Sequence, residues 1–313
     1  MKIGFPSLGK YTGYIYSLLS DLGFKQLLYP PSITKEIIEE GVKYAPQDVC
    51  FPFKVTLGQE IKLLKEGADV ILFPSTGGYC IMRNYWCVQK TILEELGFKF
   101  KMIILKLKHP VESFYELKKI NSKLTLFRLL KECLWTYRQI KTLDDEEKQI
   151  NTSAKIKIGL IGEIYTVLED GINFNIVDKL QNMGCFVDRW LTLSEQVRLA
   201  VKNFYKPLKY KKYSIKKYRR LAEKYFPDIC GGHANENIVR MIKYAKEGFS
   251  GVICLAPFAC NPETISEPVF EKISKDFGIP FLKINIDENI LASSTQFHNR
   301  VEAFIENLKL NLK

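Results

Sequence analysis

The sequence has no CxxC pair, although it contains eight cysteines in 313 residues. Cysteines paired at that spacing are typical of zinc ribbons and thioredoxin-like redox motifs, so neither class is expected. A disulfide framework is not expected either, because the chain shows no secretory features and the cytosol keeps thiols reduced. Free cysteines are often small buried hydrophobic residues, so composition alone leaves open whether any of them has a chemical role.

Long apolar runs and a recognisable leader are also absent. No apolar run reaches the roughly 18 residues that a transmembrane helix needs. The first residues, MKIGFPSLGK, lack the apolar core and the small-residue cleavage site of a signal peptide. We therefore expect a cytoplasmic protein with no membrane partner.

A phosphate-binding loop is nearly present but incomplete. Residues 4–11 read GFPSLGKY, which approaches the pattern GxxxxGK[ST]. Tyr11 cannot supply the magnesium-binding hydroxyl, and only three residues precede the motif, too few for the strand that it requires. We expect no ATPase activity in this chain, so a partner would have to supply it.

The pattern of apolar residues predicts two α/β halves. Chains of this length usually exceed a single core, and 46% hydrophobic with 26% charged residues is typical of globular proteins. Strand-like runs alternate with helical periodicity at residues 2–8, 69–74, 100–107, 155–165, 186–191, 251–258 and 279–286. This alternation predicts an α/β fold of two Rossmann-like, doubly wound domains with mainly parallel sheets and helical insertions.

The expected domain boundaries follow the composition. Residues 1–110 form the expected N-terminal α/β domain, and residues 111–154 a helical segment and polar linker. Residues 155–313 form the expected C-terminal α/β domain, with a basic helical insertion at about 197–226.

The net charge of +11 is concentrated in residues 202–220, KNFYKPLKYKKYSIKKYRR, which hold nine basic residues, no acidic one and several tyrosines. Aromatic and cationic side chains together suit a nucleic-acid surface. A solvated helical face, or a dock for an acidic partner or nucleotide, explains the same residues. No recognised nucleic-acid motif accompanies the stretch, so nucleic acid is not the expected partner.

Three cysteines lie in turns that precede predicted helices: Cys50, Cys80 and Cys260. Cys80 and Cys260 also follow predicted strands, and ligands of parallel sheets bind beyond the carboxyl ends of the strands. Helix N-termini lower the pKa of a thiol, and their N–H groups can hydrogen-bond the sulfides of an iron–sulfur cluster. Three cysteines would leave one iron of a cubane open to water, sulfide or substrate. The alternative is that each is a turn cysteine of no consequence.

The other cysteines are weaker candidates. Cys230 precedes GGH and is the reserve metal ligand, and Cys87, about two turns into a predicted helix, is a second reserve, although packing is the favoured explanation. The remaining three are expected in the core: Cys133, Cys185 and Cys254.

Several polar residues near the expected site are candidates for catalysis or binding. His233 follows two glycines, and Glu163 and Tyr165 end a predicted strand, so all three are catalytic candidates. Glu263 follows Cys260 and is a substrate-binding candidate, although it also suits the first turn of a helix. Ordinary structural roles at a helix start or strand end explain these residues equally well.

Blocks around these residues resemble the 2-hydroxyacyl-CoA dehydratase superfamily. They include DVCFPFKVTLGQE, STGGYCIMRNYW, GGHANENIVRMIKYAKEG and LAPFACNPETIS. The resemblance is to the activase-associated, CoA-activase-related branch near the double-cubane cluster proteins. It covers nearly the whole chain in order, except the helical middle and the basic insertion.

The resemblance implies a cofactor and a partner. In this superfamily three cysteines per subunit hold a 4Fe–4S cluster between two Rossmann-like domains, and the motif falls on Cys50, Cys80 and Cys260. Dehydratases use the open iron on a CoA thioester, whereas double-cubane proteins join two clusters through a sulfide. Both are recharged by a separate ATP-dependent activase. A low-potential, oxygen-sensitive redox protein of an anaerobe is therefore implied, acting as a homodimer or heterodimer on a small molecule or a CoA ester.

The sequence departs from the family at two points. CIMR replaces the usual small basic sequence after the second cysteine, so Arg83 is expected to fill its substrate-binding role only in part. The chain is also shorter than dehydratase subunits, which leaves less room for a CoA pocket. Three functions stay open: an activase-dependent iron–sulfur redox protein, a 2-hydroxyacyl-CoA dehydratase subunit, and a non-catalytic scaffold or nucleic-acid-binding protein that uses the basic stretch.

Overall fold

The computed structural model describes residues 1–75, 80–106, 109–205 and 215–311. The chain divides into two compact units. Unit 1 consists of Met1–Asp144 and Leu193–Pro207, and unit 2 of Asp145–Thr192 and Leu208–Lys313. Most of the helical segment that the sequence sets apart, residues 111–154, thus lies in unit 1. The chain passes from one unit to the other after residues 144, 192 and 207.

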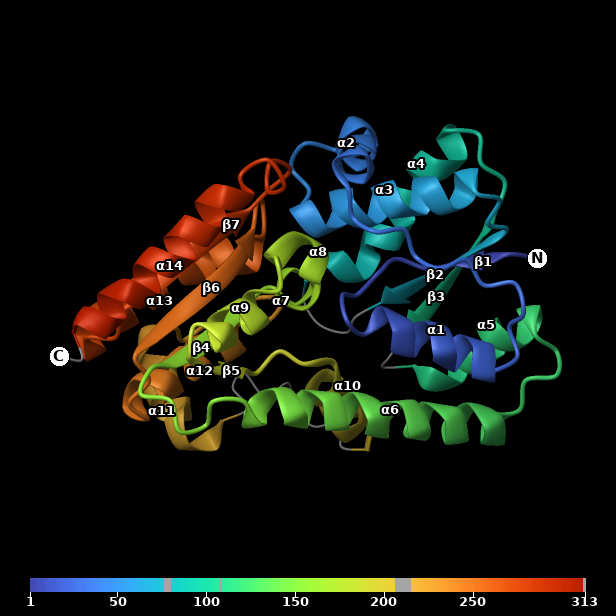
Figure 1. The fold of residues 1–313 in the computed structure, drawn as a ribbon. Coiled ribbons are helices and arrows are strands. Elements are labelled where there is room, and N and C mark those ends of the chain that lie inside the picture. Colours follow the sequence, from blue (N-terminus) through green and yellow to red (C-terminus); the bar gives the residue numbers. More distant parts are fainter. Residues whose placement is uncertain (76–79, 107–108, 206–214, 312–313) are drawn as a thin grey trace. The chain divides into compact units, whose positions relative to one another are not determined.

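Unit 1 is built on a three-stranded parallel sheet in the order β1-β2-β3. In Figure 1, helices α2, α3 and α4 lie on one face of this sheet, and α1 and α5 lie on the other. Its elements are β1 (Ile3–Gly4), α1 (Thr12–Asp21), α2 (Lys35–Tyr44), α3 (Phe51–Lys65), β2 (Val70–Ser75), the 3₁₀ helix η1 (Ile81–Asn84), α4 (Tyr85–Glu95), β3 (Lys101–Lys106), α5 (Pro110–Ile120), α6 (Leu126–Gln149, which ends in unit 2) and α10 (Leu193–Tyr205).

Two glycines allow α2 and α3 to pack closely. A Cβ atom at Gly41 would lie 1.8 Å from the carbonyl oxygen of Lys54, and one at Gly58 would lie 1.9 Å from that of Ile37. Every residue of α3 from Phe51 to Ile61 is buried, so this helix is the centre of unit 1. Because this part of α3 is packed on all sides, the position of Cys50 at its start is fixed within unit 1.

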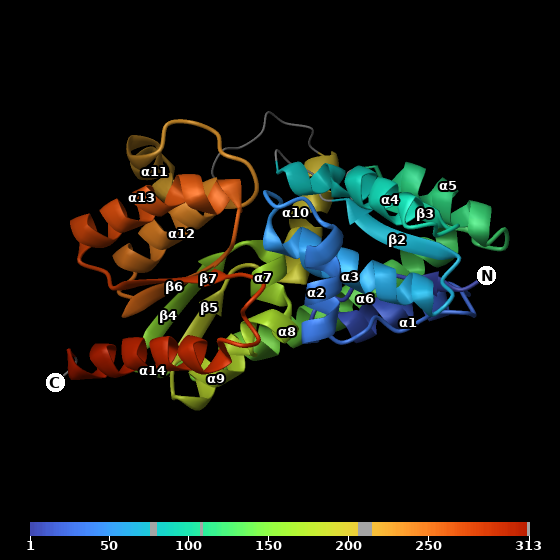
Figure 2. The ribbon, with the colours of Figure 1, turned by 90° about the horizontal axis from the view of Figure 1, so that it is seen from above.

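Unit 2 is built on a four-stranded parallel sheet in the order β5-β4-β6-β7. In Figure 2, α11, α12 and α13 lie on one face of the sheet, and α9 and α14 lie on the other. The elements of unit 2 are β4 (Lys157–Gly162), α7 (Ile164–Leu168), α8 (Asp170–Asn173), α9 (Ile176–Asn182), β5 (Phe186–Arg189), η2 (Lys216–Tyr218), α11 (Arg219–Tyr225), α12 (Ala234–Lys246), β6 (Gly251–Pro257), α13 (Asn261–Phe277), β7 (Phe281–Ile286) and α14 (Ser294–Leu310).

The order of the strands in unit 2 creates a switch point between β4 and β6. The chain proceeds from β4 to β5 in one direction and from β6 to β7 in the other. Ligands of open parallel sheets bind outside the carboxyl ends of strands at such a point. Glu163 follows β4 directly, and Cys260 lies three residues after the end of β6. The predicted α/β class with mainly parallel sheets is confirmed.

In the part of the chain that the structure describes, no helix is both long enough and apolar enough to cross a bilayer.

Candidate functional site

The three turn cysteines occupy the same local position. Cys50, Cys80 and Cys260 are the N-cap residues of α3, η1 and α13, and each has an extended backbone conformation. Among these described residues, no cysteine side chain makes a capping hydrogen bond to its own helix. In α3 and α13 a proline occupies the first turn, where its missing N–H has no helical partner to lose. The three sulfurs are thus not committed to local capping.

Cys50 makes a specific contact that sequence reasoning missed. The Tyr85 hydroxyl donates a hydrogen bond to the Cys50 Sγ atom at 3.2 Å, and it accepts one from the Cys50 N–H at 3.4 Å. Both residues are buried. Burial raises the pKa of Tyr85, and the neighbouring Cys50 and Cys80 add to this effect. The hydrogen bond joins Cys50 to the segment that begins at Cys80, because Tyr85 lies five residues after Cys80.

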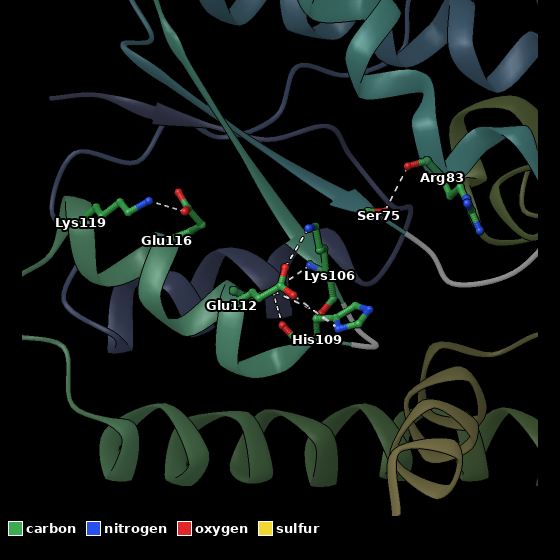
Figure 3. A network of polar contacts seen from close by, with 8 residues as sticks. Ser75, Arg83, Lys106, His109, Glu112, Glu116 and Lys119 are labelled. Carbon is green, nitrogen blue, oxygen red and sulfur yellow. Dashed lines mark hydrogen bonds and ion pairs between the residues drawn. The ribbon is translucent and has the colours of Figure 1, made fainter. Parts of the chain in front are cut away.

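Two hydrogen bonds join the end of β2 to Arg83 on η1 and Arg83 to Cys80. The Ser75 hydroxyl donates a 3.1 Å hydrogen bond to the main-chain carbonyl of Arg83, as Figure 3 shows. The Arg83 N–H in turn donates to the Cys80 carbonyl at 3.3 Å. Arg83 itself is exposed on η1. Residues 76–79, which include two glycines of the predicted turn, lie outside the described residues.

A second network of polar side chains lies at the carboxyl end of β3, the strand next to β2. Lys106 at the end of β3 forms a 2.8 Å ion pair with Glu112 on α5, and His109 lies 3.5 Å from the same carboxylate (Figure 3). These exposed contacts hold the start of α5 beside the carboxyl end of the sheet in unit 1.

Cys260 follows a strained turn in unit 2. Ala259, directly before it, has φ 59°, a left-handed conformation that costs a residue with a Cβ atom about 1 kcal/mol or more. The Cys260 side chain is 5% exposed. At the neighbouring strand end, Gly162 has φ +141°, and a Cβ there would lie 2.2 Å from the Leu255 carbonyl oxygen. The carboxyl ends of β4 and β6, on either side of the switch point, are thus closely packed.

Two buried carboxyl groups, Glu163 and Glu263, lie at this switch point. Glu163 accepts hydrogen bonds of 2.9 Å from the N–H groups of Tyr165 and Thr166, so it caps α7. Glu263 accepts from the Asn237 side chain at 2.9 Å and from the Cys254 thiol at 3.5 Å. Burial raises the pKa of Glu163, and it raises the pKa of Glu263 to about 7 with the nearby Glu163 charge adding to the effect.

Asn237 joins this carboxyl group to an aromatic cluster. Its amide donates to the carbonyl of Gly162 at 2.9 Å and accepts from the Trp190 indole N–H at 3.0 Å. His233 occupies the N-cap position of α12, and its ring meets Trp190 edge to face, with 5.6 Å between ring centroids. Burial lowers the pKa of His233 to about 4, so its imidazole is neutral at neutral pH. Asn237 carried no sequence signal beyond its place in a family-like block, and Trp190 carried none beyond its place in a predicted strand.

The remaining cysteines fall into two groups. The buried group includes Cys185 and Cys254, as predicted, and also Cys230. The Cys230 Sγ atom lies 3.9 Å from the Pro262 carbonyl, so this reserve ligand is at the first turn of α13. Cys87 and Cys133 are exposed, so the expectation that they pack in the interior is wrong. Their helices, α4 and α6, turn them to solvent.

A complete metal site is not visible within the described residues: no group of three His, Cys, Asp or Glu side chains is arranged to hold a metal ion there. Cys50 and Cys80 belong to unit 1, and Cys260 belongs to unit 2. The predicted roles of these cysteines, and those of Arg83, Glu163, Tyr165, His233 and Glu263, stay predictions.

The middle of the basic stretch, residues 206–214, lies outside the described residues. In its described end, Lys217 lies over the Tyr218 ring, 5.0 Å from its centroid, and Tyr218 hydrogen-bonds Glu247 at 3.2 Å. This part of the stretch packs against α12 and its C-terminal end.

The fold and the cysteine positions define a class: two-unit α/β proteins with parallel sheets and cysteines at helix starts. Two family models each match more than half of the chain. One, described as CoA enzyme activase uncharacterised domain, matches residues 2–188, and the other, 2-hydroxyglutaryl-CoA dehydratase, D-component, matches residues 112–308. The chain therefore belongs to this dehydratase-related family, within the 2-hydroxyacyl-CoA dehydratase superfamily, as the resemblance predicted. No curated protein matches the chain.

Proposed function

We propose that this protein is an iron–sulfur redox protein in which Cys50, Cys80 and Cys260 are ligands of a 4Fe–4S cluster, alone or as half of a double cubane. In this proposal it receives low-potential electrons from a separate ATP-dependent activase and reduces a small substrate in the cytoplasm of an anaerobe. The family match supports the superfamily, and the observation that carries the proposal is the hydrogen bond that Tyr85, five residues after Cys80, donates to the Cys50 sulfur.

The residues present fit such a group. Thiolates are the ligands that iron–sulfur clusters take, and each candidate sulfur is at an N-cap where it makes no capping bond. Tyr85 donates to one of these sulfurs, as is common for ligands of metal centres. When bound, the cluster would supply one-electron chemistry and one iron that no cysteine binds.

The polar residues of unit 2 support specific roles in this proposal. His233 is neutral at neutral pH, so one ring nitrogen can donate a hydrogen bond and the other can accept one. Glu263 has a pKa of about 7 and therefore holds a proton in roughly half of the molecules at that pH. Asn237 donates a hydrogen bond to the Glu263 carboxyl, and the Trp190 indole donates to Asn237 and so helps to orient it.

Anaerobic reconstitution with ferrous iron and sulfide tests the proposal. We expect about four irons per chain for a single cubane, and we expect Cys50→Ala, Cys80→Ala and Cys260→Ala each to lose most of this iron. Cys133→Ala and Cys185→Ala are the matched controls and should retain it. A wild-type protein that takes up no iron, or cysteine variants that bind as much iron as the controls, would contradict the proposal.

A 2-hydroxyacyl-CoA dehydratase subunit is the second candidate, because the D-component model matches residues 112–308. It predicts that the reconstituted protein binds 2-hydroxyglutaryl-CoA and, with an activase and ATP, eliminates water from it. Calorimetry and detection of the enoyl-CoA product distinguish this function from reduction of a small substrate. An oligomer with a second copy or another subunit is expected under both proposals.

A further inference from the structure

We infer that the Tyr85 hydroxyl controls how strongly the Cys50 sulfur donates electrons, which makes Tyr85 a positioning residue for the proposed cluster. This inference rests on the proposed function, since it assigns Tyr85 a role toward one ligand of that site. Nothing in the family descriptions points to this tyrosine.

The contact between the two residues is two-sided. The Tyr85 O–H donates to the Cys50 Sγ atom at 3.2 Å, while the Tyr85 oxygen accepts from the Cys50 main-chain N–H at 3.4 Å. Tyr85 is 6% exposed, and Cys50 is 6% exposed. Because both the donor and the acceptor function of the phenol are used on one residue, the O–H has a defined direction toward the sulfur.

Packing holds the phenol ring in this orientation. The Tyr85 ring meets Phe53 edge to face, with 4.8 Å between centroids and an interplanar angle of 85°. Gln89, one turn later on α4, donates to the Phe53 carbonyl at 3.2 Å and to the Thr56 hydroxyl at 2.8 Å. These bonds fix the first turns of α4 against those of α3, so the hydroxyl cannot leave the sulfur without breaking them.

The direction of the hydrogen bond decides its effect on the sulfur: the phenol donates to Cys50 Sγ. A hydrogen bond to a thiolate withdraws electron density from the sulfur and stabilises the more negative, reduced state of a metal centre. The Tyr85 bond should therefore make the reduction potential less negative than it would be without it.

Tyr85→Phe tests this inference, because it removes the oxygen and keeps the ring that packs on Phe53. We expect the reconstituted variant to bind iron like wild type and to shift the reduction equilibrium about tenfold toward the oxidised state, which corresponds to about 59 mV for a one-electron couple. Tyr11→Phe is the matched control: it also removes a buried hydroxyl of unit 1, one that bonds Asp144. Equal potentials in the Tyr85 variant, the control and wild type would overturn the inference.

Iron content and reduction potential together separate this inference from the proposed function. A wild-type protein that binds no iron would overturn the proposed function and with it this inference. Wild type and Tyr85→Phe that both bind iron and have the same potential would overturn the inference alone.

Discussion

The Tyr11 hydroxyl donates a 2.5 Å hydrogen bond to the carboxylate of Asp144, across 133 positions of sequence. The other carboxylate oxygen of Asp144 accepts from the Ser194 N–H at 3.2 Å. One buried side chain therefore joins α1, α6 and the start of α10. Asp144 ends the first part of unit 1 and Leu193 begins the second, so this carboxylate connects the two parts of the unit.

Asp144→Ala should destabilise the protein by about 2 kcal/mol, because it removes the hydrogen bonds that a buried hydroxyl and a backbone N–H make to its carboxylate. Urea denaturation followed by circular dichroism measures the change. Glu146→Gln, an exposed change on the same helix, is the control and should have little effect. Equal unfolding midpoints for the two variants would show that Asp144 does not connect the parts of unit 1.

Replacing Glu60 with Met should stabilise the protein. Glu60 is fully buried, and neither of its carboxyl oxygens has a hydrogen-bond partner among the described residues. Burial raises the pKa of Glu60 well above its ordinary value. The folded state therefore loses stability as pH rises through that raised pKa, so the gain from Glu60→Met, about 1–2 kcal/mol, should be larger at pH 8 than at pH 5.

Gln59, the residue before Glu60, provides a control for which the change in stability should have the opposite sign. Gln59 is equally buried, but its side chain bonds the Ser7 N–H, the Ser7 hydroxyl and the Pro31 carbonyl. Gln59→Met should therefore cost about 2 kcal/mol of stability. If both Met variants change the urea midpoint in the same direction, hydrogen bonding does not explain the difference between the two sites.

Gly58→Ala should be strongly destabilising, by about 3 kcal/mol or more, since its Cβ would overlap the Ile37 carbonyl oxygen at 1.9 Å and separate α2 from α3. Gly13→Ala is the control within α1, where the nearest atom, the Tyr29 hydroxyl oxygen, is 4.0 Å from the added Cβ. That variant should be neutral or more stable by up to about 1 kcal/mol. Thermal unfolding measures the stability of both variants. A Gly58 variant as stable as the Gly13 variant would show that α2 and α3 do not pack as closely as described.

Glu263 should make the stability of the metal-free protein depend on pH. Its pKa is about 7 in the folded state, above the ordinary carboxyl value of 4.5, so the folded state holds the proton more tightly than the unfolded state. The resulting stability is fully present below about pH 4.5 and is lost as pH rises to about 7, a change of about 3 kcal/mol.

Glu263→Gln removes the titrating group and should flatten the stability profile between pH 4.5 and 7, as measured by urea denaturation at several pH values. Glu271→Gln, an exposed change on the same helix, should leave the wild-type profile intact. If the Glu263 variant has the same slope as wild type, another group causes the pH dependence.

Local sequence patterns were enough to predict the sheets. The runs at residues 69–74 and 251–258 correspond to β2 (Val70–Ser75) and β6 (Gly251–Pro257), because strands buried on both faces leave a continuous apolar signal. The run at residues 2–8 gave only the two-residue β1 (Ile3–Gly4), since apolar residues after it enter the core without pairing in the sheet.

Contacts between distant residues were not predictable. The polar run 143–154 suggested a linker, yet α6 continues to Gln149 because Asp144 bonds Tyr11 and Glu147 pairs with the buried Arg189 at 2.9 Å. The same limit explains why Tyr85 was missed: its partner, Cys50, is 35 positions away. A hydrogen bond between one hydroxyl and one sulfur leaves no periodic pattern in the sequence.

The discontinuity of unit 1 has a consequence during synthesis. Its segment Leu193–Pro207 is translated after β4 (Lys157–Gly162) and β5 (Phe186–Arg189) of unit 2. A nascent chain emerging from the ribosome therefore cannot complete its first unit before much of the second has appeared, unlike proteins whose domains fold strictly one after another. Until Leu193–Pro207 has been synthesised, the Asp144 carboxylate cannot accept its hydrogen bond from the Ser194 N–H. The incomplete unit 1 is therefore exposed to chaperones and proteases for longer than its early position in the sequence suggests.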